Sequence, residues 1–353
     1  MKGATSPSFD MNADPIRDLA QLQDMLSEPT DAVIDTMRRL QGDMIILGVG
    51  GKMGPTLARM AKRASDLAGV RRRVIGVARF TSTDVPSQLE AHSIEAIRCD
   101  LLDPAQLDAL PETPNVVYMA GHKFGSTGNE SLTWAMNSYL PGPVSQKFRH
   151  SRIVAFSTGN VYPLTPVNRG GSRETDLPAP VGEYAMSCLG RERTFEYFSN
   201  MLGIPLALIR LYYATEMRYG VLVDMAQKVW RGETIDLTMG HFNCIWQGDA
   251  NAMSLCAFDH VASPPFVVNV VGPELMSVRR VGEEFGRLMN REPQFTGTEA
   301  PDALLGNAEK YQKYFGRPCV SPEQMLRWTA DWVMRGGETL GKPTHFEARD
   351  GKY

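Results

Sequence analysis

The sequence predicts an α/β protein built on a mostly parallel, doubly wound sheet, followed by a smaller C-terminal lobe. Short aliphatic runs alternate with amphipathic stretches from about residue 43, a glycine-rich turn follows the first run, and the rhythm becomes irregular after about residue 211. Strands that alternate with helices of this length form right-handed βαβ units. The chain of 353 residues can bury the large core that such a fold needs.

Residues 1–42 are expected to form a helical N-terminal extension. Val33 and Met37 have the spacing of an apolar helix face, and Thr30 or Asp31 could cap that helix. We expect this helix to lie on the main body, with a contact between protomers as the alternative.

Six short runs are expected to be strands because each is too short for a core helix and rich in aliphatic or β-branched residues. They are residues 44–49, 73–78, 97–101, 115–121, 152–158 and 205–211. Helices are expected between them at residues 55–69, 134–148 and 187–201. Residues 43–211 would therefore form a dinucleotide-binding domain of the Rossmann type.

Residues 212–340 are expected to form a substrate-binding lobe, interleaved with strands that return to the sheet, such as residues 266–272. Residues 341–353 are expected to be a tail. Ligands of doubly wound sheets bind in the crevice at the carboxyl ends of the strands, so the lobe should lie over that edge.

Composition excludes several classes of function. The formal net charge is −3 and the one basic cluster is the short run 71–73, which argues against a nucleic-acid binder. The chain has no stretch of about 20 apolar residues and no apolar signal core near residue 1, so no membrane association is expected. Five scattered cysteines without metal-type spacing favour the cytoplasm and no metal site.

The glycine-rich turn contains Gly48, Gly51 and Gly54, directly after the first expected strand and at the start of a helix. A turn this tight needs residues without Cβ, and the helix start presents backbone N–H groups to a pyrophosphate. Lys52 and Met53 lie inside the same loop and are expected to contact the cofactor. The alternative is a structural turn with no ligand.

The cofactor is expected to be NADP, with NAD possible. The second strand ends at Ala78 and Arg79, where NAD sites usually carry a carboxylate; a guanidinium can instead bind a 2′-phosphate. Ser82 is a possible helper, and stacking of Arg79 on adenine would leave the preference open. Asp100, after the third strand, is expected at the adenine edge unless it caps the next helix.

Three later segments add chemistry to this framework: YMAGHK at 118–123, AFSTGNVYP at 155–163 and EYAMSC at 183–188. Together with the glycine loop and several later matches, they make residues 43–335 resemble a known family. The later matches are Arg210, the RGE of 231–233, Asp249 and the segments VNVVGPELMSVRRVGEEF and KYFGRPCVSPEQMLRWTADWV. This family is the extended short-chain dehydrogenases/reductases, the NAD-dependent epimerases and dehydratases.

The resemblance implies that Tyr184 passes a proton to or from a substrate hydroxyl while hydride moves to or from C4 of the nicotinamide. Thr158 would hydrogen-bond the same substrate oxygen, and Ala120 and Gly121 would face the cofactor. In the family a lysine four residues after the tyrosine lowers its pKa, whereas this chain has Cys188 there.

Loss of that cation should slow proton transfer by orders of magnitude unless another group replaces it. Lys123, in a stretch that resembles the AGxK of epimerases in the family, is the favoured replacement, and Arg191 is the other. His122 could act as an acid or base, or be an ordinary loop histidine.

The substrate is expected to be a small molecule, namely a free sugar or sugar acid rather than a nucleotide sugar. Family members that act on nucleotide sugars carry an arginine shortly before the position of Asp249, and GHFNCIWQGD has none. Arg218 could bind a phosphate or carboxylate instead, or lie on the surface. Asn160, expected at the substrate, follows Gly159 where family dehydratases have an acidic pair, which argues against a dehydratase.

Two functions remain at this stage. The first is an NAD(P)-dependent oxidoreductase or epimerase acting on a sugar hydroxyl, favoured by Thr158 and Tyr184 together. The second is a cofactor-binding sensor or scaffold without catalysis, favoured by Cys188. The resemblance also implies a homodimer that pairs through the helices beginning near Trp134 and Tyr184.

Overall fold

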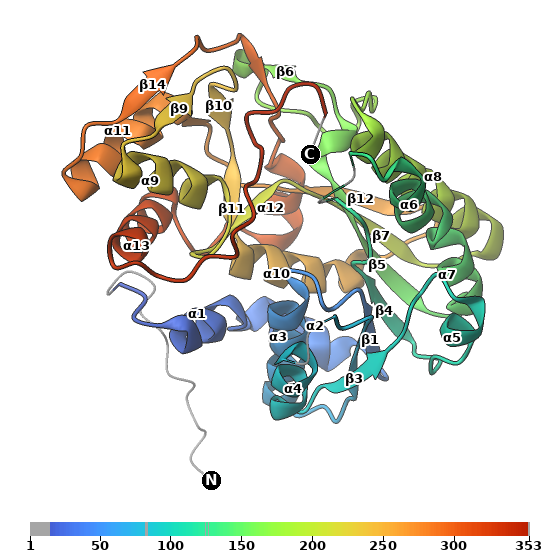
Figure 1. Ribbon diagram of the computed structural model, residues 1–353. Helices are drawn as coiled ribbons and strands as arrows, with labels where there is room; N and C mark the ends of the chain where they lie inside the picture. The colour runs from blue at the N-terminus through green and yellow to red at the C-terminus, as the bar shows by residue number, and fades with distance from the viewer. Residues whose placement is uncertain (1–14, 82–83, 124, 126, 352–353) are drawn as a thin grey trace.

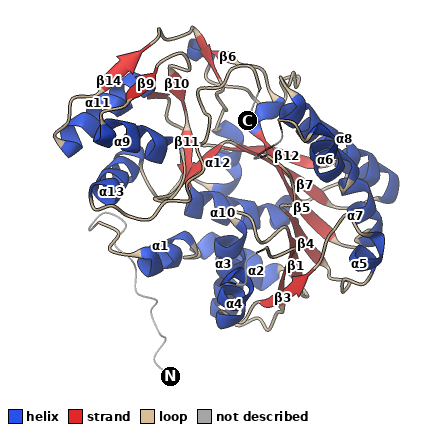
Figure 2. Ribbon diagram, viewed as in Figure 1, coloured by secondary structure: helices blue, strands red, loops and turns tan. Residues whose placement is uncertain are grey.

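The central sheet has seven parallel strands in the order β12-β7-β5-β4-β1-β2-β3 (Figures 1 and 2). The computed structural model describes residues 15–81, 84–123, 125 and 127–351. The strands are β1 (Met44–Leu47), β2 (Val74–Ala78), β3 (Glu95–Arg98), β4 (Asn115–Tyr118), β5 (Arg152–Thr158), β7 (Leu206–Leu211) and β12 (Phe266–Val270). Because β1 pairs with β2 on one side and β4 on the other, the strand order reverses there. The predicted doubly wound parallel sheet is confirmed.

Helices cover both faces of this sheet. Successive residues of β1 point to opposite sides, so Ile46 packs with α2 (Asp31–Arg39), α3 (Gly54–Leu67) and α10 (Gln247–Cys256). Its neighbour Ile45 packs with α5 (Pro104–Asp108), α7 (Pro141–Lys147) and α8 (Glu183–Leu202). Strands buried on both faces explain the near-continuous aliphatic runs in the sequence.

The two N-terminal helices pack on the main body. Thr30 is the N-cap of α2, and its hydroxyl accepts a hydrogen bond from the backbone N–H of Val33 at 3.4 Å. The preceding helix α1 (Leu19–Leu26) is tied to α3 by ion pairs from Arg59 to Asp24 and from Arg63 to Glu28. The extension therefore forms one wall beside the glycine loop.

A second group of elements sits beyond the carboxyl ends of the strands (Figure 1). Its helices are α9 (Val221–Arg231), α11 (Val278–Met289), α12 (Glu309–Phe315) and α13 (Pro322–Met334). Its short strands are β6 (Thr165–Pro166), β8 (Tyr213–Thr215), β9 (Thr234–Asp236), β10 (His241–Phe242), β11 (Cys244–Trp246), β13 (Met276–Ser277), β14 (Gln294–Thr296) and β15 (Asp302–Ala303). The apolar core of α9, α11 and α13 is separate from the two cores against the sheet, whereas Tyr311 of α12 packs in one of the sheet cores.

The C-terminal segment after α13 crosses this second group toward the start of α8 (Figure 1). Its backbone is fixed by Leu340, which donates to the carbonyl of Arg218 at 2.9 Å. Thr344 donates to the carboxylate of Asp224 from both its backbone N–H, at 2.8 Å, and its hydroxyl, at 2.6 Å. The segment is therefore held against the protein along its length.

Two segments differ from the sequence-based expectation. The third strand spans Glu95–Arg98 rather than 97–101, because residues 99–103 form a turn in which Asp103 N–H donates to the carbonyl of Asp100. The helix expected at 134–148 is divided into α6 (Glu130–Trp134), a π-helical turn η1 (Ala135–Tyr139) and α7. Pro141 has no N–H to continue the α-helical bonding into η1. Within the described residues, no helix combines the length and apolar character that crossing a bilayer requires.

Candidate active site

The glycine loop joins β1 to α3 and leaves the helix start open. Gly48 has φ +89°, and a Cβ on it would lie 2.6 Å from the backbone nitrogen of Ala120. Only glycine tolerates both conditions. No side chain caps α3, which has Pro55 in its first turn. Its first N–H groups are therefore available to an anion such as a pyrophosphate.

A cavity of about 390 Å³ lies beside this loop, at the carboxyl ends of β1, β2 and β4. It brings together most of the predicted cofactor residues: Gly48, Gly51, Arg79, Asp100, Ala120 and Gly121. Gly54 is buried below, at the start of α3. Dinucleotide sites share three features: the positive end of a helix dipole, a glycine turn that lets the backbone approach the ligand closely, and a reversal of strand order. All three occur here, so the residues present fit such a cofactor.

The end of this cavity away from the glycine loop carries Arg79 and Asp100. The carboxylate of Asp100 accepts from the backbone of Leu102 at 3.1 Å, and the cap of α5 is Asp103. The alternative that Asp100 caps the next helix is therefore wrong. Arg79 is exposed, and its carbonyl accepts from Arg98 at 2.7 Å, which brings a second guanidinium that the sequence did not single out. Ser82 lies outside the described residues.

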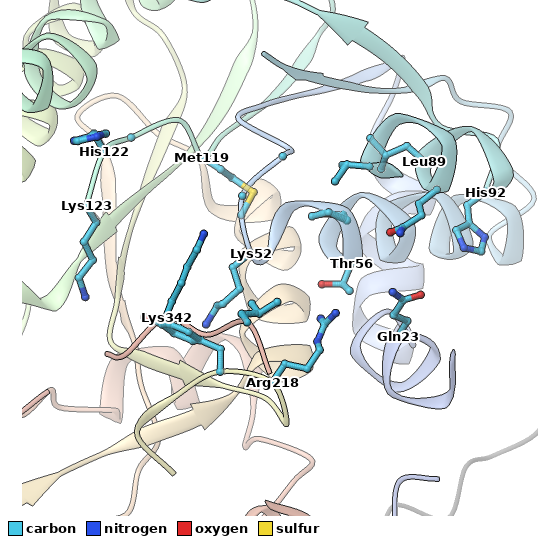
Figure 3. Close-up of a pocket in the computed structure, with 18 of the residues that line it drawn as sticks. Gln23, Lys52, Thr56, Leu89, His92, Met119, His122, Lys123, Arg218 and Lys342 are labelled. Carbon is cyan, nitrogen blue, oxygen red and sulfur yellow. The ribbon is translucent and has the colours of Figure 1, made fainter. Parts of the chain in front are cut away.

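A larger cavity of about 590 Å³ continues from the glycine loop to Tyr184. Figure 3 shows Gln23, Thr56, Leu89 and His92 gathered at one end of it. Lys52, Lys123 and Lys342 lie toward the other end, and Arg218 lies between these lysines and Gln23; the four cations come from four different segments (Figure 3). This end is strongly basic.

Tyr184, at the start of α8, lines both this cavity and a smaller one. Its hydroxyl is linked by side-chain hydrogen bonds to Thr158 and Cys188. Burial raises the pKa of Tyr184 well above its ordinary value, and the neighbouring Cys188 raises it further. The charge of Arg191 and the hydrogen bond to Thr158 act in the opposite direction and lower that pKa. Thr158 and Tyr184 thus lie together, as predicted.

Arg191 is built into the floor of the site. Its guanidinium donates to the carbonyl of Phe156 at 2.9 Å and to the side chain of Asn137. A Cβ on Gly121 would lie 2.4 Å from the guanidinium, so glycine at that position leaves room for the arginine. The Nε of Arg191 is buried without a hydrogen-bond partner among the described residues. Other parts of the Arg191 side chain line the larger cavity.

Lys123 also lies near the tyrosine. Its Nζ is 5.8 Å from the centroid of the Tyr184 ring. Burial lowers the pKa of Lys123 to about 8. Both candidate replacements for the missing lysine therefore lie near Tyr184, and the charge of Arg191 lowers the pKa of the phenol.

His122 and Asn160 occupy different parts of the site. The Nδ1 of His122 is 3.1 Å from the Thr133 hydroxyl, which fixes the imidazole against α6 at the wall of the larger cavity. Asn160 lines the smaller cavity, where its side-chain oxygen accepts from the Thr158 hydroxyl at 2.9 Å. Of the two, Asn160 is the one placed beside the predicted reaction centre.

Arg218 is not a surface residue. Its guanidinium pairs with the fully buried Glu216, with Nε–O and Nη2–O distances of 3.0 Å. The arginine lines the larger cavity with its charge partly balanced by that carboxylate.

Several site residues gave no sequence signal. Asn137 is buried in the π-helical turn, where its side chain accepts from the backbone of His122 at 2.9 Å and donates to Ser187 at 2.9 Å. Lys342 and Thr344 line the two cavities, although residues 341–353 were expected to be a tail. The described residues contain no cluster of three or more His, Cys, Asp or Glu side chains that could hold a metal ion.

Comparison with known proteins identifies the fold. No protein-family model and no curated protein sequence matches the chain. Among solved structures, UDP-glucuronic acid 4-epimerase from Bacillus cereus with NAD has a TM-score of 0.67 and 16% identity, covering 83% of this chain and 99% of its own. UDP-glucose 4-epimerase from Thermotoga maritima has a TM-score of 0.66 and 16% identity, covering 83% of this chain and 99% of its own. For dTDP-glucose 4,6-dehydratase from Bacillus anthracis with NAD, the TM-score is 0.68 and the identity 15%, covering 84% of this chain and 97% of its own. The chain shares their Rossmann-like fold over most of its length.

The expectation of a free sugar in preference to a nucleotide sugar is wrong by this comparison. The Bacillus cereus epimerase has also been solved with UDP-glucuronic acid, and the Thermotoga maritima epimerase with UDP-glucose. The expectation was based on one missing arginine before Asp249. That argument left out the lysines of other segments, since Lys52 and Lys342 line the larger cavity together with Arg218, the substitute anion binder that the sequence suggested.

Proposed function

We propose that the protein is an NAD(P)-dependent epimerase or oxidoreductase that acts on a hydroxyl group of a nucleotide sugar. The single observation that carries this proposal is the placement of Thr158 and Tyr184. They are hydrogen-bonded to each other where the smaller cavity meets the one that runs along the glycine loop. A proton-transfer pair at the junction of a cofactor site and a substrate site is what hydroxyl oxidation needs.

The residues of this chain would have separate roles in cofactor binding and in proton transfer. A bound nicotinamide would supply hydride acceptance and donation. Gly48, Gly51 and the open start of α3 would hold the pyrophosphate. Tyr184 would remove the proton from the sugar hydroxyl, and Thr158 would orient that hydroxyl by a hydrogen bond. Arg191, which lowers the pKa of the tyrosine, is a positioning residue for this step.

The alternative is a nucleotide-holding sensor without catalysis. It is favoured by Cys188, which stands where the family has a lysine. Burial raises the pKa of Cys188, so the thiol stays neutral near pH 7 and supplies no positive charge to the tyrosine.

The direct test is turnover. The purified protein is incubated with NAD or NADP and a panel of UDP- and dTDP-sugars, and epimers are separated by chromatography while nicotinamide absorbance at its reduced band is followed. Epimer formation, or stoichiometric reduction of the cofactor, is the expected result. Tight cofactor binding with no change in any sugar would favour the sensor.

NADP preference is a further expectation, because Arg79 lines the cavity after the end of β2, where a 2′-phosphate would lie, and the Arg98 guanidinium donates to its carbonyl. We expect Arg79→Ala to weaken NADP binding by about ten- to a hundredfold while changing NAD binding little. Equilibrium binding of both cofactors measures this. Equal weakening of the two would indicate adenine stacking instead.

The homodimer, the cytoplasmic location and the division into residues 1–42, 43–211, 212–340 and 341–353 stay predictions. Exposed apolar side chains occur on α6, η1 and α8, among them Trp134, Tyr139, Tyr197 and Met201. Such a face suits pairing with a second copy.

A further inference from the structure

Lys52 is a lysine of the glycine loop whose side chain turns into the site. Its Nζ donates to the carbonyl of Ala214, on β8, at 2.9 Å. The same nitrogen lies 3.9 Å from the centroid of the Tyr219 ring, in a cation–π contact. These contacts fix the ammonium group across the boundary between the glycine loop and the second lobe.

The charges around this ammonium are not balanced by carboxylates free to pair with it. Burial lowers the pKa of Lys52 to about 7; Glu216 opposes this, whereas Lys123 lowers the pKa further. Glu216 is engaged by Arg218 through three donors. Asp224, the other nearby carboxylate, accepts from Thr344. Because both carboxylates already accept hydrogen bonds from other residues, an anionic ligand would be a suitable partner for the buried ammonium of Lys52.

The smaller cavity brings the two lysines and the proposed proton-transfer residues, Thr158 and Tyr184, to one place. Its volume is about 190 Å³, and it is lined by Lys52 and Lys123 as well as by Thr158, Asn160 and Tyr184. This volume is below the range of about 300–1,000 Å³ for pockets that take larger ligands, so it suits one sugar ring and not the attached nucleotide. A ring hydroxyl at Tyr184 would leave a substituent of the same ring within this cavity to meet the lysines; the diphosphate is the competing occupant, because Lys52, Lys123 and Tyr184 also line the larger cavity.

We propose that Lys52 and Lys123 bind a carboxylate on the reacting sugar ring, so that the protein selects nucleotide-linked uronic acids over nucleotide-linked neutral sugars. This inference rests on the proposed function. The two lysines come from different segments, the glycine loop and the loop after β4. Each ammonium would donate to the carboxylate, and such charge-assisted hydrogen bonds are stronger than those of a neutral hydroxymethyl group.

The test is equilibrium binding by calorimetry, with protein saturated with NAD and carrying Tyr184→Phe so that no turnover occurs. UDP-glucuronic acid and UDP-glucose are compared, since they differ in the ring carboxylate. We expect the parent protein to bind UDP-glucuronic acid about ten- to a hundredfold more tightly, and Lys52→Met to remove most of this difference by weakening that ligand alone. Lys52→Arg should retain part of it.

Two controls accompany this experiment. Lys62→Met removes a lysine of the following helix, α3, that pairs with Asp66 and lines none of the cavities of the site, and it should leave both affinities unchanged. The melting temperature of Lys52→Met should not fall, because methionine keeps the apolar stem and removes an ammonium that burial disfavours.

Each outcome separates this inference from the proposed function. Equal affinity of the parent for the two ligands would overturn the inference, and so would an equal loss of both in Lys52→Met, which would place the diphosphate at the lysines. Tyr184-dependent turnover would still support the proposed function in either case. Absence of binding by both nucleotide sugars would overturn both.

Discussion

Replacement of Tyr184 by phenylalanine is expected to lower kcat on the substrate by about 10²–10⁴. The substitution removes one oxygen and keeps the ring that packs at the start of α8. Thr158 would still contact the substrate hydroxyl, but no group would remain to take its proton. Because the hydroxyl lies apart from the cavity around the glycine loop and Arg79, the dissociation constant of the cofactor should change less than threefold or so.

Steady-state kinetics and cofactor titration on the same preparations check this expectation. Tyr311→Phe is the matched control, since Tyr311 is a buried tyrosine of α12 whose hydroxyl has no hydrogen-bond partner in the described part of the chain. It should keep full activity. A Tyr184→Phe enzyme within tenfold of the parent would mean that the proton leaves by another route.

The fold and the geometry of the glycine loop were predictable because their signals are local. The strand Met44–Leu47 is aliphatic, Gly48 follows it, and α3 starts six residues later, so strand, turn and helix can be recognised in one short stretch of sequence. The same holds for Thr158 and Tyr184, which stand at the end of a strand and the start of a helix. Parallel strands bring such positions to one edge of the sheet.

The charge arrangement was not predictable because it is made by packing. Arg191 reaches the site only since Gly121 leaves space for it and Asn137 anchors it from a π-helical turn. No pattern in residues 135–139 indicates that turn. The segment around Lys342 shows the same limit, since its position over the cavity depends on Thr344 binding Asp224, 120 residues away in sequence.

The mistaken preference for a free sugar has the same origin. It considered the missing arginine and Arg218 as its substitute, but it left out the lysines. In the folded chain Lys52 and Arg218 approach the cavity from the glycine loop and the loop before α9. The charge of an active site is the sum over all segments that line the folded cavity. The residue at one sequence position therefore reports only one contribution to that charge.

Replacement of Arg191 by methionine is expected to lower kcat at neutral pH by about ten- to a thousandfold and to move the pH profile toward alkaline pH. Arg191 lowers the pKa of Tyr184, and loss of an adjacent opposite charge shifts a pKa by about one to three units. The base form of the tyrosine is the active one, so below its pKa the rate falls tenfold for each unit by which that pKa rises. The rising limb of the profile should move to higher pH by the same amount.

Arg191→Lys distinguishes this role from a structural one. A lysine keeps positive charge on α8, so its profile should lie between those of the parent and Arg191→Met, even though it loses the hydrogen bond to Phe156 or to Asn137. Melting temperature and cofactor affinity are measured for both variants. If both lose activity equally with an unshifted pH profile, Arg191 only supports the fold, and the charge on the phenol must come from Lys123, whose Nζ lies 5.8 Å from the ring.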